Sequence, residues 1–517
     1  MKASYVVKTV LVSTVAAGLV ACSSKTEDGG ASSPNENKDS GGKTITYNIM
    51  RNNGIAEYPA DGGKGKQEIL KGLDKAGIKG IDFNVTMPAT GQEYLTKLNL
   101  LATSGELPDY FNLDIPTMTR MADEGLLLPL DDMIKNMPNA SKLYKASDIE
   151  ALRYKGKLYA FPVGYRPEPF NGPNTNGFIV RKDWLDNLGL KQPATIDELH
   201  EVLKAFTTKD PDKNGKNDTF GLGGSKMSNT STSFAGIFGA FGIYPNFWAE
   251  KDGVLKMGMT LPETKEVLKL LNAWYKEGII DPEFLLMEKK QLEEKIINSK
   301  IGVFEGSAFD VDPKQPLINS VKKVTPAAAF SLLTPPKGPA GKNGWPEAGP
   351  AYGDIKSISA KAKNPELLAK LIDWSTNDGP NGGFNLVTYG IEGEHYTYDK
   401  DKNRIKQLVA SYSDLYKQGF SNPVRMNQVV DRRWMSDEGL AAMEITNKFV
   451  LVNPFWKTVS AQIEYPDINK LWLEYFSKIV LGDLPVDKFD EFVTKYYQQG
   501  GKKIEEQVNE EWKKAKK

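Results

Sequence analysis

The chain is poor in cysteine and histidine: among 517 residues it has one cysteine, Cys22, and two histidines, His200 and His395. A single thiol cannot form a disulfide within the chain, so the fold must be stabilised by its hydrophobic core. A chain of this length buries enough surface for that purpose. Two histidines are too few for a His-rich zinc site.

The chain also lacks an excess of charge of either sign. Its 66 Lys and Arg residues balance 66 Asp and Glu residues, and no basic stripe interleaved with aromatic residues stands out. We therefore expect no nucleic-acid partner. No internal repeat is evident, and no apolar run after the N-terminus is long enough to cross a bilayer.

Motifs for nucleophilic or phosphate chemistry are missing as well. No G-x-S-x-G sequence occurs, and residues 62–67 (Gly-Gly-Lys-Gly-Lys-Gln) have neither the spacing nor the Ser/Thr of a phosphate-binding loop. A glycosidase stays open as an alternative, because its two carboxylates need to be close in space and not in sequence.

The first 22 residues have the features of a targeting segment. Lys2 and Lys8 precede an apolar run, residues 9–21, that has no charge and is too short to span a membrane. The run ends in Leu19-Val20-Ala21-Cys22, which is similar to the bacterial lipobox. This resemblance implies cleavage before Cys22 and acylation of its thiol with diacylglycerol and palmitate, so that lipid alone connects the protein to the membrane. An ordinary secretory peptide with an incidental cysteine is the alternative.

Residues 23–43 consist mainly of Ser, Gly, Asn, Asp, Glu and Lys and include no large apolar side chain. Such a segment cannot bury enough apolar surface to offset the entropy lost on ordering. We expect a flexible tether between the lipid and the folded part of the chain.

The segment from residue 44 to residue 113 alternates between strand and helix patterns. Alternating apolar residues predict strands over 44–50, 81–85 and 107–113, and a helical period predicts helices over 66–76 and 93–103. This order is typical of a parallel or mixed sheet with helices on its faces. Ligands of such sheets bind beyond the carboxyl ends of the strands.

Longer-range landmarks then follow in a fixed order along the chain. The order resembles that of bacterial extracellular solute-binding proteins, family 1-like, and most of all the large Gram-positive lipoproteins linked to oligosaccharide uptake by ABC importers. The segments that carry the resemblance are 124–131, 154–162, 176–190, 193–198, 274–282, 302–306, 364–374 and 389–393.

This resemblance implies an α/β, two-lobed fold of the periplasmic-binding-protein type. Each lobe has a mixed sheet flanked by helices, and a multi-strand hinge joins the lobes around a ligand cleft. We expect chain crossings near residues 162–166, 304–307 and 358–361. Lobe 1 would comprise 44–162 and 307–358, and lobe 2 would comprise 163–306 and 359–517, with C-terminal helices packed on lobe 2.

A loop after the helix that Thr195 and Glu198 are expected to cap carries oxygen-bearing side chains at alternate positions. It resembles the first nine positions of an EF-hand loop, but Gly221 stands where an EF-hand has its bidentate glutamate. We expect a structural calcium ion, with a polar turn as the alternative. The expected ligands are Asp210, Asp212, Asn214, the carbonyl of Lys216, and Asp218.

Carbohydrate ligands need aromatic plates and planar polar groups, because sugars present apolar C–H faces and hydroxyl rims. Trp184 and Trp374 lie in helical patterns and are expected in the core. Trp248, Trp345 and Trp434 are the expected stacking residues. The complete set of ligand-binding candidates is Asn52, Asn53, Asp114, Tyr165, Arg166, Glu168, Trp248, Glu305, Trp345, Tyr352, Arg433 and Trp434.

Together these features predict a binding protein and not an enzyme. It would capture an oligosaccharide at the extracellular face of the cell membrane and deliver it to the permease subunits of an ABC transporter. A surface polysaccharide-degrading enzyme and a peptide-binding or signalling lipoprotein are the alternatives.

Overall fold

A computed structural model describes residues 44–54, 57–144, 146–162, 164–165, 176–226, 234–346, 355–409, 412–428 and 431–515. These residues belong to one compact unit that begins at Thr44. The predicted signal peptide, lipid site and tether lie outside the described residues. None of the helices in the described part of the chain is long and apolar enough to cross a membrane.

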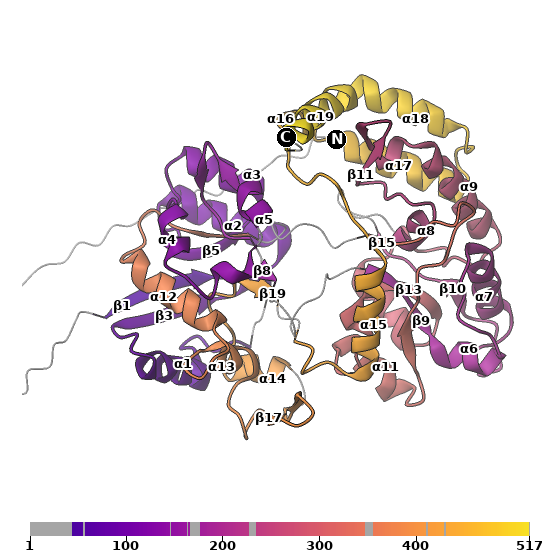
Figure 1. Ribbon diagram of the computed structural model, residues 1–517. Helices are drawn as coiled ribbons and strands as arrows, with labels where there is room; N and C mark the ends of the chain where they lie inside the picture. Colours follow the sequence, from indigo (N-terminus) through magenta and orange to yellow (C-terminus); the bar gives the residue numbers. More distant parts are fainter. Residues whose placement is uncertain are drawn as a thin grey trace, which may run out of the picture. The chain divides into compact units, whose positions relative to one another are not determined.

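The first sheet has the strand order β16-β5-β1-β3 (Figure 1). Strands β1 (Ile45–Met50), β3 (Ile81–Thr86) and β5 (Tyr110–Leu113) are parallel, and β16 (Ile355–Ile358) joins β5 antiparallel. The predicted parallel or mixed sheet is therefore confirmed. Because β1 and β5 are neighbours that run in the same direction, their carboxyl ends lie at the same edge.

Helices cover both faces of this sheet. The connection through α1 (Gly63–Lys75) steps from β1 to β3, and the connection through α2 (Gly91–Ser104) steps back from β3 past β1 to β5. Right-handed crossovers in opposite directions place these two helices on opposite faces, as Figure 1 shows. The other helices of this part of the chain are α3 (Ile115–Asp123), α4 (Asp131–Lys135), α5 (Ala146–Ala151), α12 (Pro365–Thr376), α13 (Phe384–Tyr389) and α14 (Tyr412–Lys417).

The second sheet has the order β10-β13-β9-β14, with β10 (Phe220–Leu222) parallel to β13 (Ile301–Ser307). Strand β9 (Asn176–Arg181) is antiparallel to both of its neighbours, β13 and β14 (Phe330–Leu332). Successive side chains of β9 enter different cores, since Phe178 and Val180 pack in one cluster and Ile179 in another. This alternation is what a strand covered on both faces requires.

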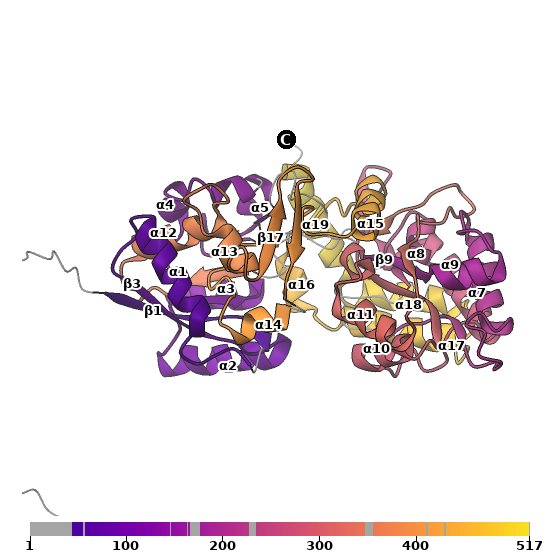
Figure 2. The same cartoon turned by 90° about the horizontal axis from the view of Figure 1, so that it is seen from below.

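The second sheet is also flanked by helices, and the C-terminal helices pack in the same core, as Figure 2 shows for α17 and α18. The predicted cap of α7 is present: the Thr195 hydroxyl accepts from the Glu198 backbone N–H at 3.2 Å. Trp184 is fully buried as expected. The helices and remaining short strands are α6 (Lys182–Leu188), α7 (Ile196–Thr208), α8 (Ala235–Ala240), β11 (Trp248–Lys251), β12 (Val254–Met257), α9 (Pro262–Lys276), α10 (Lys289–Ile297), α11 (Pro316–Val324), β15 (Trp345–Pro346), α15 (Asp437–Lys448), β20 (Val450–Leu451), α16 (Ser460–Glu464), α17 (Ile468–Leu481), α18 (Lys488–Tyr496) and α19 (Lys502–Ala515).

The two sheets define two lobes, but the lobe boundaries differ from the predicted ones. Residues 307–346 were predicted in lobe 1, yet β14 is an edge strand of the second sheet and Val311 and Val321 lie in a core with Ile179. Residues 359–426 were predicted in lobe 2, yet Leu368 and Met426 lie in the core of the first sheet. Lobe 1 is therefore 44–162 and 355–426, and lobe 2 is 176–346 and 435–515.

The chain passes between the lobes at different places from those predicted. The first pass follows Pro162, close to the prediction, but the others lie between 346 and 355 and between 426 and 435. Residues 304–307 continue β13 within lobe 2, and residues 358–361 connect β16 to α12 within lobe 1. At the first and third passes, β8 (Gly164–Tyr165) and β19 (Asn427–Gln428) pair in parallel.

Candidate binding site

The carboxyl ends of β1 and β5 bring polar residues together at one edge of the lobe 1 sheet. Asn52 follows β1, and its backbone N–H donates to the Asn112 side-chain oxygen at 3.2 Å. The Asn52 side chain in turn accepts from the Gly91 N–H at 3.1 Å. Asp114 follows β5 and caps α3 by accepting from the Thr117 N–H at 2.9 Å. The side chains of Asn52 and Asp114 thus accept hydrogen bonds from backbone N–H groups and hold the loops at this edge in place.

Arg51 connects this edge to a segment from late in the chain. Its Nη1 donates to the Ser421 hydroxyl and, at 2.9 Å, to the backbone oxygen of Asn422. The same segment approaches α1 closely, where the Gly65 N–H donates to the Gln418 oxygen at 2.7 Å. Gly419, with φ +85°, could not be replaced, because a Cβ there would lie 1.8 Å from the Gly62 oxygen.

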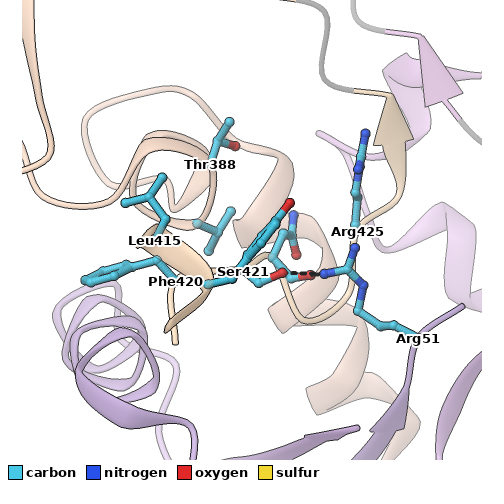
Figure 3. Close-up of a pocket in the computed structure, with 9 residues that line it drawn as sticks. Arg51, Thr388, Leu415, Phe420, Ser421 and Arg425 are labelled. Carbon is cyan, nitrogen blue, oxygen red and sulfur yellow. Dashed lines mark hydrogen bonds between the residues drawn. The ribbon is translucent and has the colours of Figure 1, made fainter. Parts of the chain in front are cut away.

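A cavity of about 150 Å³ lies between Arg51 and this late segment (Figure 3). In this view Arg51 and Arg425 lie on one side of it, and Thr388, Leu415 and Phe420 lie on the other. The Thr388 hydroxyl oxygen is buried and has no hydrogen-bond partner among the described residues. The described residues that line the cavity are Arg51, Val387, Thr388, Leu415, Tyr416, Phe420, Ser421, Asn422 and Arg425.

In lobe 2, Glu305 of β13 faces the first turn of α8. Its Oε2 accepts from the Phe234 backbone N–H at 3.0 Å, whereas its Oε1 is buried without a partner in the described part of the chain. Burial raises the pKa of the Glu305 carboxyl to about 7, although the N–H groups of Phe234, Ala235 and Gly236 act in the opposite direction. Glu305 is thus a buried acceptor with one oxygen to spare.

The three tryptophans expected to stack on a ligand are all packed inside the protein. Trp345 is 0% exposed, Trp248 5% and Trp434 6%. Trp345 donates its indole N–H to the Leu333 oxygen at 3.2 Å, and Trp434 donates its own to Gln407 at 3.2 Å. In this structure none of the three presents an open ring face, which stacking on a ligand would require.

Arg433, another ligand candidate, lies between the lobe 1 and lobe 2 ranges and is held by Asp431. Its Nε contacts both oxygens of Asp431, at 3.0 and 2.9 Å, and Asp431 also accepts from the Tyr389 hydroxyl at 2.6 Å. The arrangement is a buried ion pair in the fold. Asn53 lies in β2 (Asn53–Gly54), paired with β4 (Pro88–Ala89). Arg166, Glu168, Tyr352 and the side chain of Tyr165 lie outside the described residues.

The predicted calcium loop follows α7, and hydrogen bonds between its own residues close it into a tight turn. Asp210 accepts from the backbone N–H groups of Asn214 and Gly215, both at 3.0 Å. The Asn214 amide donates to Asp212 at 2.8 Å and to Asp218 at 3.3 Å. The Lys216 N–H donates to the Asn214 side-chain oxygen at 2.7 Å. The expected ligands therefore lie around one turn.

Two features of this loop fit a cation and two oppose it. The Asp212 Oδ1 is buried without a described partner, and burial together with the Asp210 carboxylate raises the pKa of Asp212. Lys300, however, pairs with Asp218. Over the described ranges, no three His, Cys, Asp or Glu side chains form a ready metal site. The calcium ion stays a prediction.

Comparison with known proteins places this geometry in a family. The model of the bacterial extracellular solute-binding proteins matches residues 56–381. The chain belongs to this family. Its members bind solutes, which agrees with the prediction of a binding protein and not an enzyme.

Individual relatives extend over most of the chain. The polygalacturonan/rhamnogalacturonan-binding protein YtcQ of Bacillus subtilis (strain 168) is 28% identical over 87% of this chain and 89% of its own length. The structure of the Streptococcus pneumoniae substrate-binding protein FusA with kestose has a TM-score of 0.69 at 20% identity, covering 91% of this chain and 99% of that one. The structure of the alginate-binding protein AlgQ2 without calcium ion has a TM-score of 0.68 at 21% identity. The match covers 91% of this chain and 98% of AlgQ2. These structures confirm the two-lobed fold.

Sequence reasoning missed the residues that form the cavity: Arg51, Thr388, Ser421 and Arg425. Arg51 directly precedes the predicted Asn52 and Asn53, so the strand-end rule that selected them could have included it. Thr388, Ser421 and Arg425 carry no comparable local pattern, because only the folded chain brings them to β1.

Proposed function

We propose that the protein captures a carbohydrate oligomer outside the cell and delivers it to the permease of an ABC transporter. Membership of the extracellular solute-binding family supports uptake of a solute. The names of YtcQ, FusA and AlgQ2 refer to carbohydrate ligands in each case. The observation that carries the proposal is the polar cavity at the carboxyl end of β1, where α/β proteins of this type bind ligands.

The chemistry of that cavity suits a sugar. Arg51, Thr388 and Ser421 supply donors and acceptors for hydroxyl groups, and Val387, Leu415 and Phe420 supply an apolar wall for C–H groups. Glu305 adds a carboxylate oxygen in lobe 2. A ligand that contacts residues of both lobes would stabilise the closed form, because only that form satisfies both sets of contacts.

The test is co-elution of unlabelled ligands with the protein in gel filtration. The purified chain is mixed with a pool of plant and bacterial oligosaccharides, separated by gel filtration, and its co-eluting small molecules are identified by mass spectrometry. A peptide pool serves as the control. We expect sugars to co-elute unchanged and peptides not to. Enrichment of peptides alone would contradict the proposal.

We also propose a lipid anchor at Cys22, supported by the similarity of residues 19–22 to a lipobox. Replacing Cys22 with Ser should release the protein into the medium, whereas Ser24→Ala should leave it on the membrane. Membrane retention of the Cys22→Ser variant would contradict the anchor.

We further propose a structural calcium ion at Asp210, Asp212, Asn214, Asp218 and the Lys216 carbonyl. The buried Asp212 oxygen supports it, since a cation would supply the missing partner. When bound, the ion would contribute stability to lobe 2 and no step of ligand capture.

A further inference from the structure

The third passage of the chain between the lobes changes from one core to the other within a single step. Trp434 packs in a cluster with Tyr396 and Ile405, which belong to lobe 1. Its neighbour Met435 packs in a lobe 2 cluster that includes Ile179. Hinge motion between lobes is absorbed by a few residues at the ends of packed elements. The step from Trp434 to Met435 is such a place, because one lobe ends there and the other begins.

The backbone oxygens on the two sides of this step are each held by a cation of the opposite lobe. Lys314, in lobe 2, donates from Nζ to the Trp434 oxygen, and the same Nζ lies 4.7 Å from the centroid of the Trp434 ring. Arg404, in lobe 1, donates from Nη1 to the Met435 oxygen at 2.6 Å. Each bond has one charged partner, and such bonds are stronger than those between neutral groups.

We propose that these two contacts, of Lys314 with Trp434 and of Arg404 with Met435, form a clasp that holds the two lobes of the free chain in a preferred arrangement. This inference goes beyond the proposed function, because it concerns the lobes before any ligand binds. A rotation of one lobe against the other has to move both contacts. The clasp therefore sets how freely the lobes rotate.

Asp312 fixes the lobe 2 end of the clasp. Its side chain is completely buried, and its two oxygens accept from different parts of the chain: Oδ1 from the Lys314 N–H at 3.0 Å and Oδ2 from the Ser436 N–H at 2.6 Å. One carboxylate thus connects the backbone of Lys314 to the residue that follows Met435. The Lys314 side chain is held beside the step that it crosses.

Strand β18 (Arg404–Gln407) fixes the lobe 1 end. The Ile405 N–H donates to the Arg433 oxygen at 2.7 Å, directly before the step. Arg404 itself also donates from Nη2 to the Asp437 carboxylate at 2.5 Å, in the first turn of α15. From one position on lobe 1, Arg404 therefore contacts both the backbone and a side chain of lobe 2.

The experiment measures the distance between the lobes by pulsed electron paramagnetic resonance, after exhaustive dialysis and without added sugar. Because Cys22 is the only cysteine, a Cys22→Ser chain carries spin labels only at two introduced cysteines. Lys97→Cys in α2 and Glu266→Cys in α9 place the labels at exposed positions of lobe 1 and lobe 2. A second pair, Lys97→Cys with Lys370→Cys in α12, measures a distance within lobe 1.

Each end of the clasp is then removed separately and together. We expect Arg404→Gln and Lys314→Met each to widen the distribution of interlobe distances, and the combined variant to at least double its width. The distribution within lobe 1 should stay that of the native chain. Lys406→Gln, on the same strand as Arg404, and Lys323→Met, in α11, are the matched controls. Each removes an exposed positive charge and should leave both distributions unchanged.

A combined variant that keeps the native width of the interlobe distribution would overturn the clasp, and so would equal widening in the control variants. Widening of the lobe 1 pair to the same extent would contradict it as well, because lobe 1 itself would then have loosened. If the combined variant does not fold, the two single variants decide by the same criteria. The readout involves no sugar, so the clasp and the proposed carbohydrate function can fail independently.

Discussion

Arg51 Nη1 lies 2.9 Å from the backbone oxygen of Asn422, although 371 positions separate the two residues in the chain. This contact joins the carboxyl end of the first strand to the last part of lobe 1. It also defines one wall of the cavity. The geometry of the candidate site therefore depends on a connection between distant parts of the chain.

Removing this connection should destabilise lobe 1. Arg51→Ala deletes the bonds to Ser421 and Asn422, and a bond that involves a charged group contributes about 1.5–3 kcal/mol. We expect the free energy of unfolding in urea to fall by about 2 kcal/mol. Arg120→Ala, which removes an exposed pair with Glu124, should change it by less than about 1 kcal/mol. Equal effects of the two substitutions would contradict the described role of Arg51.

Glu305 should make stability depend on pH. Its folded pKa, about 7, lies above the unfolded value of 4.5. Below pH 4.5 both states are protonated. Between pH 4.5 and 7 the Glu305 carboxyl ionises in the unfolded chain but stays protonated in the folded chain. The stability contributed by this carboxyl is therefore lost as pH rises. At about 1.4 kcal/mol per pKa unit, the loss reaches about 3 kcal/mol.

The measurement is thermal unfolding at pH 4.5, 6 and 8. Glu305→Gln should be more stable than the native chain at pH 8, and this advantage should shrink toward pH 4.5. Glu266→Gln, on the exposed face of α9, serves as the control and should follow the native chain at every pH. An advantage of Glu305→Gln that is the same at all three pH values would count against a raised pKa.

The calcium proposal predicts that calcium stabilises the folded chain and that this effect depends on the ligands of the 210–218 loop. Calcium at a hundred times its dissociation constant should raise the free energy of unfolding by about 2.7 kcal/mol, because it binds only the folded state. Asp212→Asn should abolish this rise, whereas Asp186→Asn, on the surface of α6, should keep it. A melting temperature that responds to neither calcium nor chelator would rule the site out.

Trp345 should matter for folding and not for ligand contact. Its ring fills space that two glycines leave open, since a Cβ at Gly177 or Gly236 would lie 2.9 or 2.1 Å from it. Trp345→Ala should cost about 3–5 kcal/mol of stability, and Trp345→Phe should cost less. Sugar affinity, measured at a temperature where both variants are folded, should equal that of the native chain. A selective loss of affinity would restore Trp345 to the binding site.

Local sequence patterns predicted the elements of lobe 1 well. The periodicities located β1, α1, β3, α2 and β5 to within about three residues, because apolar side chains repeat with the period of each element. The same rule placed Asn52 and Asp114 at the strand ends. Such predictions succeed where neighbouring residues determine the outcome.

The return of residues 359–426 to lobe 1 was not predictable in this way. Contacts such as that between Arg51 and Asn422 join residues hundreds of positions apart, and no local pattern encodes them. Trp345 shows the same limit: we expected it to stack on a ligand, but Gly177 and Gly236, far away in sequence, create the space that buries it.

The central claim, that this chain binds a carbohydrate without converting it, is tested most directly by calorimetric titration with the sugar that co-elutes with the protein. The same samples are then analysed for new reducing ends and unsaturated products. We expect one-to-one binding and ligand recovered unchanged. Absence of heat for every sugar in the co-eluting fraction, or the appearance of cleaved products in proportion to time, would contradict the account.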